Sequence, residues 1–243
     1  MIFGAFMSIL DQTIVNIAIP RLQNAFGADL ESVQWVLTAY ILTQGVVTPT
    51  TAFFADRLGT KRFYILALAI FTAGSALCGL AWSLPVLIIF RVLQGVGGAA
   101  LFPLAITMLY REFPPHQRGL ASGLLGIAAL LAPAVGPTLG GYFVIYVNWQ
   151  LIFFVNVPIG LVGVLLAVML LCEVRTETRT PFDVPGFVLA ATGLAAVLYA
   201  LSDASTDGWG SGKVLGFLLG GLVILGFFVF VELVLARRKC LKP

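Results

Sequence analysis

Charged residues are scarce in this sequence. Asp, Glu, Lys and Arg make up only 10% of its 243 residues, whereas soluble proteins average about 25%. Hydrophobic residues account for 60% of the chain and occur in long runs. Since a helix needs roughly 20 mostly apolar residues to cross the hydrocarbon core of a bilayer, the composition excludes a soluble fold. It predicts an all-α polytopic membrane protein.

Three further absences limit the possible functions. Cys78, Cys172 and Cys240 lie far apart without CxxC spacing, so we expect neither a disulfide framework nor a metal site. The single histidine, His116, has no evident Ser or Cys partner, which argues against an enzyme. The cations gather at helix ends and form no recurring basic face, which argues against a nucleic-acid partner. We also expect no cofactor.

Eight apolar runs are expected to cross the membrane. The N-terminus lacks both a basic region and a small-residue cleavage site, so the first run is expected to remain as a helix and not to act as a signal peptide. The expected spans cover residues 1–20, 33–55, 63–82, 84–110, 119–145, 149–171, 184–201 and 214–236.

The positive charges are distributed unevenly between the two sides of these spans. With both termini on the cytoplasmic side, the outer loops hold only Arg21 and Lys213, and Arg91 lies inside a span. Because short loops rich in Lys and Arg stay in the cytoplasm, we expect a multi-pass protein of the cell (inner) membrane with both termini cytoplasmic. The eleven inner cations are Arg57, Lys61, Arg62, Arg111, Arg118, Arg175, Arg179, Arg237, Arg238, Lys239 and Lys242.

A polar stripe runs along the first expected span. Ser8, Gln12 and Asn16 recur at intervals of four, with Asp11 beside them on the helical wheel. Such a stripe is expected to face a cavity or other helices. An ionised carboxylate near mid-span costs about 2.5–3.5 kcal/mol or more. Asp11 is therefore either a proton-exchanging acid or a structural acid satisfied by neighbouring helices.

Polar residues also occur in the second and fourth spans. Gln34 and Thr38 share one face of the second span and are expected to line the same cavity, as is Gln94 of the fourth. Arg91 lies too deep in the fourth span to be a topology signal and needs an anionic or carbonyl partner. Asp11 is expected at a similar depth. The third span has no comparable stripe and is expected to face lipid.

Small residues line the fifth span at spacings of four and three, which predicts a close helix–helix contact. Pro133 and Pro137 remove backbone donors and are expected to bend the helix. The segment is therefore either a surface on which two bundles rock or a static, kinked packing helix. The small residues are Ser122, Gly126, Ala129, Pro133, Gly136 and Gly140.

A compact charged turn joins the second and third spans and forces them to be antiparallel neighbours. It is either a solvated turn that sets topology or a functional gate. Its distinctive residues are Asp56, Arg57, Gly59, Lys61 and Arg62.

Five sequence motifs resemble those of the fourteen-helix drug:proton antiporter branch of the major facilitator superfamily, and they occur along the chain in the same order as in that branch. The loop motif departs from the usual pattern at Ala52 and Thr60, and Ala132 stands where a Gly is common. The motifs are residues 10–20; the loop motif at 55–62; Arg91, Gln94, Gly95 and Gly97; the antiporter motif Gly136-Pro137-Thr138-Leu139-Gly140-Gly141; and Trp149 with residues 156–160.

The resemblance implies a fold and its subdivisions. Residues 1–172 are expected to form a six-helix transporter bundle with a 3+3 repeat, and 173–183 a cytoplasmic linker. Residues 184–243 are expected to form two additional transmembrane helices and a basic cytoplasmic tail. In such transporters, the substrate and proton pathways lie between two six-helix halves.

The resemblance also implies a function. We expect the N-terminal part of a proton-coupled exporter of drugs or amphipathic metabolites that works by alternating access. Asp11 and Arg91 would couple protons, and the loop around Asp56 would latch the inner gate. The expected partners are membrane lipids, protons, a small amphipathic substrate and a missing C-terminal half. The alternative is a truncated fragment or an assembly partner without transport of its own.

Overall fold

The computed structural model describes residues 1–173 and 183–240, and of residues 205–206 and 234–240 it describes the backbone alone. Most of the predicted 173–183 linker and the side chains of the basic tail therefore lie outside the described residues. The chain divides into two compact units, Met1–Gln44 with Thr51–Arg179 and Gly45–Thr50 with Thr180–Pro243. All regular structure in the described residues is helical, as predicted.

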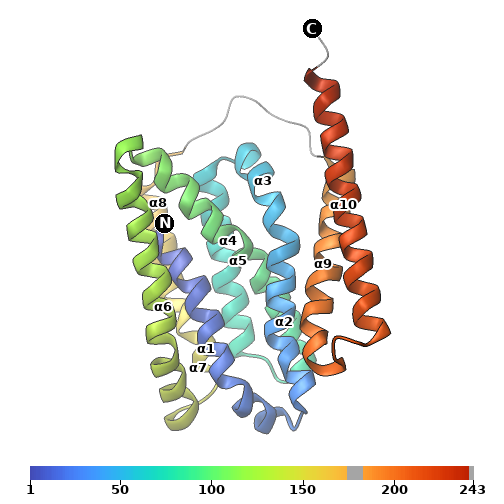
Figure 1. Ribbon diagram of the computed structural model, residues 1–243. Coiled ribbons are helices and arrows are strands. Elements are labelled where there is room, and N and C mark those ends of the chain that lie inside the picture. The colour runs from blue at the N-terminus through green and yellow to red at the C-terminus, as the bar shows by residue number, and fades with distance from the viewer. Residues whose placement is uncertain (174–182, 241–243) are drawn as a thin grey trace. The chain divides into compact units, whose positions relative to one another are not determined.

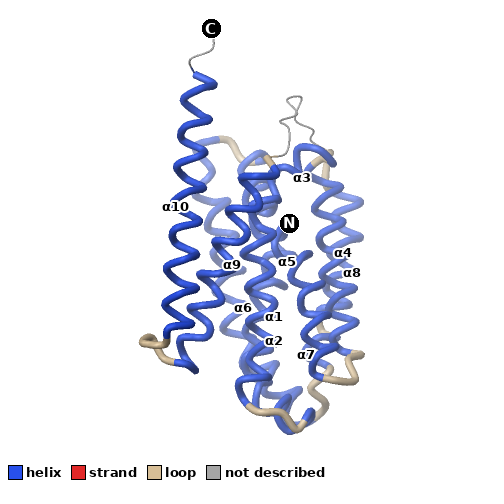
Figure 2. Tube along the Cα trace, turned by 90° about the vertical axis from the view of Figure 1, so that its right-hand side faces the viewer, coloured by secondary structure: helices blue, strands red, loops and turns tan. Residues whose placement is uncertain are grey.

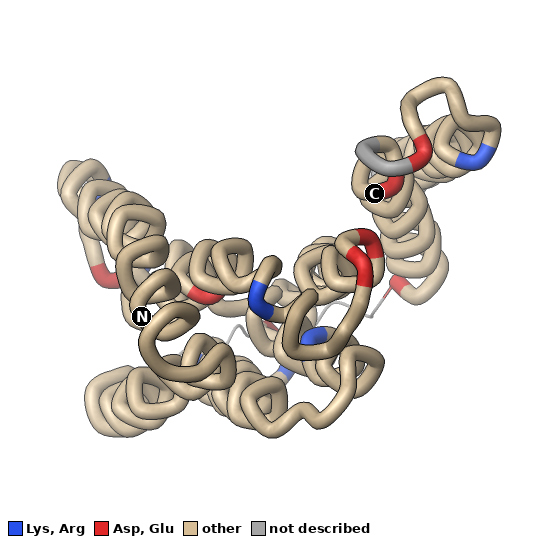
Figure 3. The backbone as a smooth tube through the Cα atoms, turned by 90° about the horizontal axis from the view of Figure 1, so that it is seen from below, with Lys and Arg blue, Asp and Glu red and all other residues tan. Residues whose placement is uncertain are grey.

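Figures 1 and 2 show a molecule built mainly of long helices, and Figure 3 shows how few charged residues they carry. The helices are α1 (Ile2–Phe26), α2 (Leu30–Val47), α3 (Thr51–Leu58), α4 (Thr60–Gly79), α5 (Leu84–Glu112), α6 (Arg118–Tyr146), α7 (Leu151–Phe154), α8 (Asn156–Leu170), α9 (Val184–Asp207) and α10 (Gly212–Cys240), with short 3-10 turns η1 (Thr48–Thr50) and η2 (Pro115–Gln117).

Seven segments of the described chain are long and apolar enough to cross a membrane, and the second expected span is not among them. That span is divided into α2, η1 and α3, and the break falls at Pro49, which cannot donate a backbone hydrogen bond. Polar residues such as Glu31 and Gln34 lower the hydropathy of α2. The three pieces nevertheless run from the end of α1 to the start of α4 (Figure 1).

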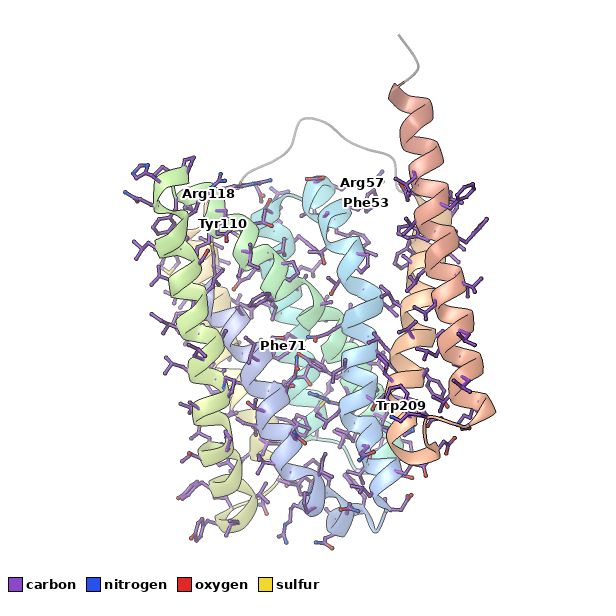
Figure 4. The ribbon with its side chains drawn as sticks, in the orientation of Figure 1. Phe53, Arg57, Phe71, Tyr110, Arg118 and Trp209 are labelled. Carbon is purple, nitrogen blue, oxygen red and sulfur yellow. The ribbon has the colours of Figure 1, made fainter. Side chains whose placement is uncertain are left out.

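Close helix contacts hold the first unit together. α4 packs against both α5 and α8, and α1 packs against α6. A Cβ atom on Gly97 of α5 would collide with backbone atoms of Phe71 and Ala67 on α4, so this glycine lets the two backbones touch. Phe71, labelled in Figure 4, is completely buried inside the bundle. The glycine-containing motif of the fourth expected span thus lies at a close helix–helix contact.

The predicted small-residue seam of the fifth span is correct only at its last two positions, Gly136 and Gly140. Gly136 and Gly140 of α6 face Thr13 and Ile14 of α1 so closely that a Cβ atom would touch them. Ser122 and the motif residues Pro133 and Pro137 are exposed, and a Cβ on Gly126 or on Gly141 would meet nothing within 4 Å. The described face that packs inward comprises Ala121, Leu125, Ala128, Ala132, Gly136 and Gly140.

Apart from Gly45–Thr50, the described part of the second unit is a helical hairpin of α9 and α10. The Asp183 side chain caps α9 by accepting a hydrogen bond from the backbone N–H of Gly186 at 3.0 Å, as expected for an N-cap. At the opposite end, Lys213 of α10 pairs with Asp203 of α9 at 2.6 Å. Trp209, in the turn, is 63% exposed (Figure 4), which suits an aromatic side chain at a membrane interface.

Candidate functional site

A buried ion pair connects α1 and α5. Arg91 donates from Nη1 to Oδ2 of Asp11 at 2.5 Å, and both side chains have no exposed surface. Arg91 therefore has the anionic partner that its depth in the span called for, and Asp11 lies at the expected similar depth. They are enclosed by helices of the first unit and do not line an open cavity.

Two amides complete the environment of the Asp11 carboxylate. Gln94 of α5 donates from Nε2 to Oδ1 at 3.0 Å, and Asn156 of α8 donates from Nδ2 to the same oxygen at 2.9 Å. A buried charge is tolerated only where it is paired and hydrogen-bonded. Three side-chain donors from two helices therefore converge on the Asp11 carboxylate.

The guanidinium of Arg91 has its own set of partners. Its Nε donates to the backbone carbonyl of Val36 at 3.0 Å, and its Nη1 donates to Oε1 of Gln94 at 2.7 Å. Its Cζ lies 4.1 Å from the ring centroid of Tyr40 and 5.7 Å from that of Phe153. A planar guanidinium can bond in its plane and stack on rings at its faces. Arg91 thereby joins α1, α2, α5 and α7.

The third expected span does not simply face lipid, which corrects the sequence prediction. Ser75 of α4 is fully buried, donates to the carbonyl of Phe153 at 2.9 Å and accepts from Nδ2 of Asn156 at 3.1 Å. Ser75 is not among the functional residues predicted from the sequence, and Asn156 is predicted only as part of a motif. A polar residue inside an apolar span was the signal available for both.

A second polar network lies between α1 and α2. Gln12 donates to Oε1 of Gln44 at 3.3 Å, and Gln44 donates to Oγ of Ser8 at 3.2 Å. The hydroxyls of Ser8 and Tyr40 are 3.1 Å apart. Because the Tyr40 ring stacks on Arg91, this network connects the half-buried Gln12 and Gln44 to the ion pair. We call these four residues the Gln12–Tyr40 network.

The other expected cavity residues take different positions. Asn16 is exposed on α1, while Gln34 and Thr38 are half-buried on α2. Gln94 is completely buried beside Arg91, so the structure groups it with the ion pair and away from any open face. Periodicity in the sequence shows which residues share a polar face of a helix, but it does not show how deeply each side chain is buried. It therefore could not distinguish the exposed, half-buried and buried positions.

The charged turn before α4 forms a reciprocal clamp with the end of α8. Glu173 accepts the backbone N–H of Lys61 at 3.2 Å and lies 3.6 Å from Nε of Arg62. The Lys61 ammonium donates to the carbonyl of Val168 at 2.8 Å. A carboxylate thus caps the N-terminus of α4, and a cation caps the C-terminus of α8, as the free backbone groups and helix dipoles favour. We call this arrangement the Glu173 clamp.

The other residues of the loop motif have separate structural roles. Gly59 has φ +92°, and a Cβ there would collide with the Glu173 carboxylate. The Arg57 guanidinium lies 5.6 Å from the ring centroid of Phe53 on its own helix (Figure 4), and Asp56 is half-buried. At the start of α6, Arg118 stacks similarly on Tyr110 of α5, with its guanidinium carbon 5.9 Å from the ring centroid (Figure 4).

Replacing Gly59 by alanine is expected to destabilise the protein by about 1–3 kcal/mol, because a non-Gly residue is strained at this φ and its Cβ would displace Glu173. Thermal unfolding in detergent measures the effect. Gly123→Ala on α6 is the matched control, since a Cβ there meets nothing within 4 Å. Equal melting temperatures for the two variants would contradict the clamp.

The chain matches the sequence profile described as Major Facilitator Superfamily over residues 1–239. It belongs to the major facilitator superfamily. The MFS-type transporter YhcA of Bacillus subtilis is 36% identical over 230 residues, which cover 95% of this chain and 43% of YhcA. The protein named "Putative multidrug resistance protein MdtD" of Salmonella typhi is 36% identical over 228 residues, with 94% and 48% coverage.

Solved structures of superfamily transporters share the fold. The crystal structure of the peptide transporter POT in complex with sulfate has a TM-score of 0.67 at 17% identity, covering 95% of this chain and 50% of that one. The human organic anion transporter MFSD10 has a TM-score of 0.64 at 14% identity, with 88% and 57% coverage. The predicted fold class and family are confirmed. The chain spans about half the length of the curated relatives that it matches.

Proposed function

We propose that this chain forms the N-terminal part of a proton-coupled secondary exporter of drugs or amphipathic metabolites, working by alternating access. The fully buried pair of Asp11 and Arg91 carries the proposal. Burying an ion pair often stabilises a fold no more than apolar residues of similar volume would, so stability alone does not account for it. Ionisable residues inside membrane spans commonly mark proton relays.

Proton binding would act by weakening the ion pair. A proton on Asp11 removes the negative partner of Arg91, which leaves a buried cation whose carboxylate has become a neutral acid. The attraction that ties α1 to α5 is thereby reduced, and a rearrangement of these helices becomes less costly. The Gln12–Tyr40 network links the same guanidinium to the half-buried face of α1 and α2, where cargo would bind.

The proton gradient is a sufficient energy source for such export, and no cofactor is needed. One elementary charge moved through 100 mV provides about 2.3 kcal/mol. For one electroneutral cargo molecule exchanged per proton, this corresponds to a gradient of about fiftyfold.

The similarity to MdtD supports a drug-like or amphipathic cargo. Gln12, Asn16, Gln34 and Thr38 offer neutral hydrogen-bonding groups that suit varied amphipathic molecules. We propose a second, C-terminal half as the partner that completes the cargo cavity. The exposed Pro133 and Pro137 of α6 would lie on the surface that rocks against it.

We further propose a location in the cell (inner) membrane with both termini cytoplasmic. The charge bias of the loops supports this orientation, provided that α2, η1 and α3 together cross the bilayer. The Glu173 clamp, with Lys61 and Arg62, would then lie at the cytoplasmic gate. The function requires no catalytic chemistry.

Transport by reconstituted protein tests the proposal. Proteoliposomes that contain the protein in its natural full-length form and carry a pH gradient should move an amphipathic fluorescent dye against its gradient, and a protonophore should stop the movement. Residues 1–243 alone are the comparison. Proton-linked dye movement by this segment alone would exclude the alternative of a fragment without transport of its own. Dye movement that is unaffected by collapse of the pH gradient would refute proton coupling.

A further inference from the structure

The Asp11 carboxylate is surrounded by hydrogen-bond donors. Arg91 donates to Oδ2, and Gln94 and Asn156 both donate to Oδ1. This arrangement suits an ionised carboxylate, which only accepts hydrogen bonds. A protonated carboxylic acid also carries an O–H group that needs an acceptor, and leaving that group unbonded in a buried site is costly. Proton binding therefore requires that one donor be exchanged for an acceptor.

Asn156 carries an unused acceptor close to Asp11. Its side chain has no exposed surface, and its Oδ1 is buried without a hydrogen-bond partner. Its Nδ2 lies 2.9 Å from Oδ1 of Asp11. A carboxamide has nearly the same shape after a half-turn that exchanges its oxygen and nitrogen. Such a turn would present the free oxygen of Asn156 to Asp11.

The carboxamide of Gln94 cannot make the same half-turn without losing hydrogen bonds. Its Oε1 accepts hydrogen bonds from Arg91 Nη1 at 2.7 Å and from Cys78 Sγ at 3.6 Å. A half-turn of Gln94 would set its NH₂ group against the donor of Arg91. The two amides that contact Asp11 therefore differ, since only the oxygen of Asn156 is free to accept a new hydrogen bond.

Ser75 can adjust to a turn of Asn156. Its hydroxyl accepts from Nδ2 of Asn156 and donates to the carbonyl of Phe153. A serine hydroxyl has one O–H and can both donate and accept, so after the turn it can donate to Oδ1 of Asn156 in place of the carbonyl of Phe153. The turn would leave one amide atom of Asn156 unpartnered, as it is now, and its further cost is limited to the hydrogen bond from Ser75 to the carbonyl of Phe153.

We propose that Asn156 is a positioning residue whose carboxamide turns over when Asp11 binds a proton. A proton delivered by water binds to Oδ1 of Asp11, and the resulting O–H donates to Oδ1 of Asn156. The charged or titratable groups that act on Asp11 among the described residues are Arg91, Tyr40 and Cys78. The inference rests on the proposed proton coupling and adds Asn156 and Ser75 to its machinery.

Infrared difference spectroscopy on the natural full-length protein tests this exchange. Acidification should produce a carboxylic-acid C=O band that Asp11→Asn removes. In Asn156→Leu, the band should move to higher wavenumber, because the acid has lost its acceptor. A band at the unchanged wavenumber in Asn156→Leu would overturn the inference. The absence from the unsubstituted protein of any band that depends on Asp11 would instead refute the proposed function.

Two further variants keep the test decisive if Asn156→Leu does not fold. Ser75→Ala removes the hydroxyl that supports the turned amide, so it should shift the acid band in the same direction by a smaller amount. Thr72→Val lies one turn away on α4, and the Thr72 hydroxyl donates only to the carbonyl of Leu68. This control should leave the band unmoved. Equal spectra for Ser75→Ala and Thr72→Val would contradict a role for Ser75 and Asn156.

Discussion

Asp11→Asn is expected to reduce pH-driven export to the background level while the protein still inserts into the membrane. The amide is similar in size to the carboxylate and can keep hydrogen bonds within the cluster, but it cannot bind and release a proton in the physiological range. The measurement is dye accumulation in inside-out membrane vesicles energised by a pH gradient, with the amount of inserted protein determined in parallel.

Asp29→Asn is the matched control for this prediction. It makes the same chemical change at an exposed position between α1 and α2, so export should remain at the unsubstituted level. If Asp11→Asn also exports normally, Asp11 has no part in proton coupling, and the ion pair is structural.

Arg91→Ala is expected to have the largest effect on stability. It removes one partner of a buried pair and leaves the Asp11 charge uncompensated, which costs about 3–5 kcal/mol. It also removes the hydrogen bond to the carbonyl of Val36 and the stacking on Tyr40. Chemical unfolding in mixed micelles measures the loss.

A double-mutant cycle separates the charge effect from lost packing. Asp11→Asn combined with Arg91→Ala leaves no unpaired buried charge, so the double variant should be more stable than Arg91→Ala alone. Strictly additive losses would show that Asp11 and Arg91 do not stabilise each other. Arg91→Lys, which keeps the charge but lacks the planar fork, should fall between Arg91→Ala and the unsubstituted protein.

The partners of the ion pair could be recognised from the sequence because charged residues are almost absent from the expected membrane spans. In spans that exclude charge, Asp11 and Arg91 each require an explanation, and each is the natural partner of the other. The close approach of α5 could be predicted on similar grounds, since glycines at Gly95 and Gly97 remove side chains that would separate two helices.

Other features could not be predicted from local patterns. Asn156 and Ser75 are single polar residues in apolar segments and produce no periodic stripe, and their contact joins positions 81 residues apart. The Glu173 clamp joins residues 112 apart. The inward face of α6 lies one residue before each of the predicted positions Ser122, Gly126, Ala129 and Pro133, because a small residue permits close packing without requiring it.

Proton release on cargo binding tests the central claim most directly. Purified full-length protein in weakly buffered detergent solution, at a pH where Asp11 is protonated, is mixed with saturating dye, and the released protons are counted with a pH indicator. The account predicts release from the unsubstituted protein and none from Asp11→Asn that still binds dye. Equal release from both proteins would show that the proton resides elsewhere and would contradict the account.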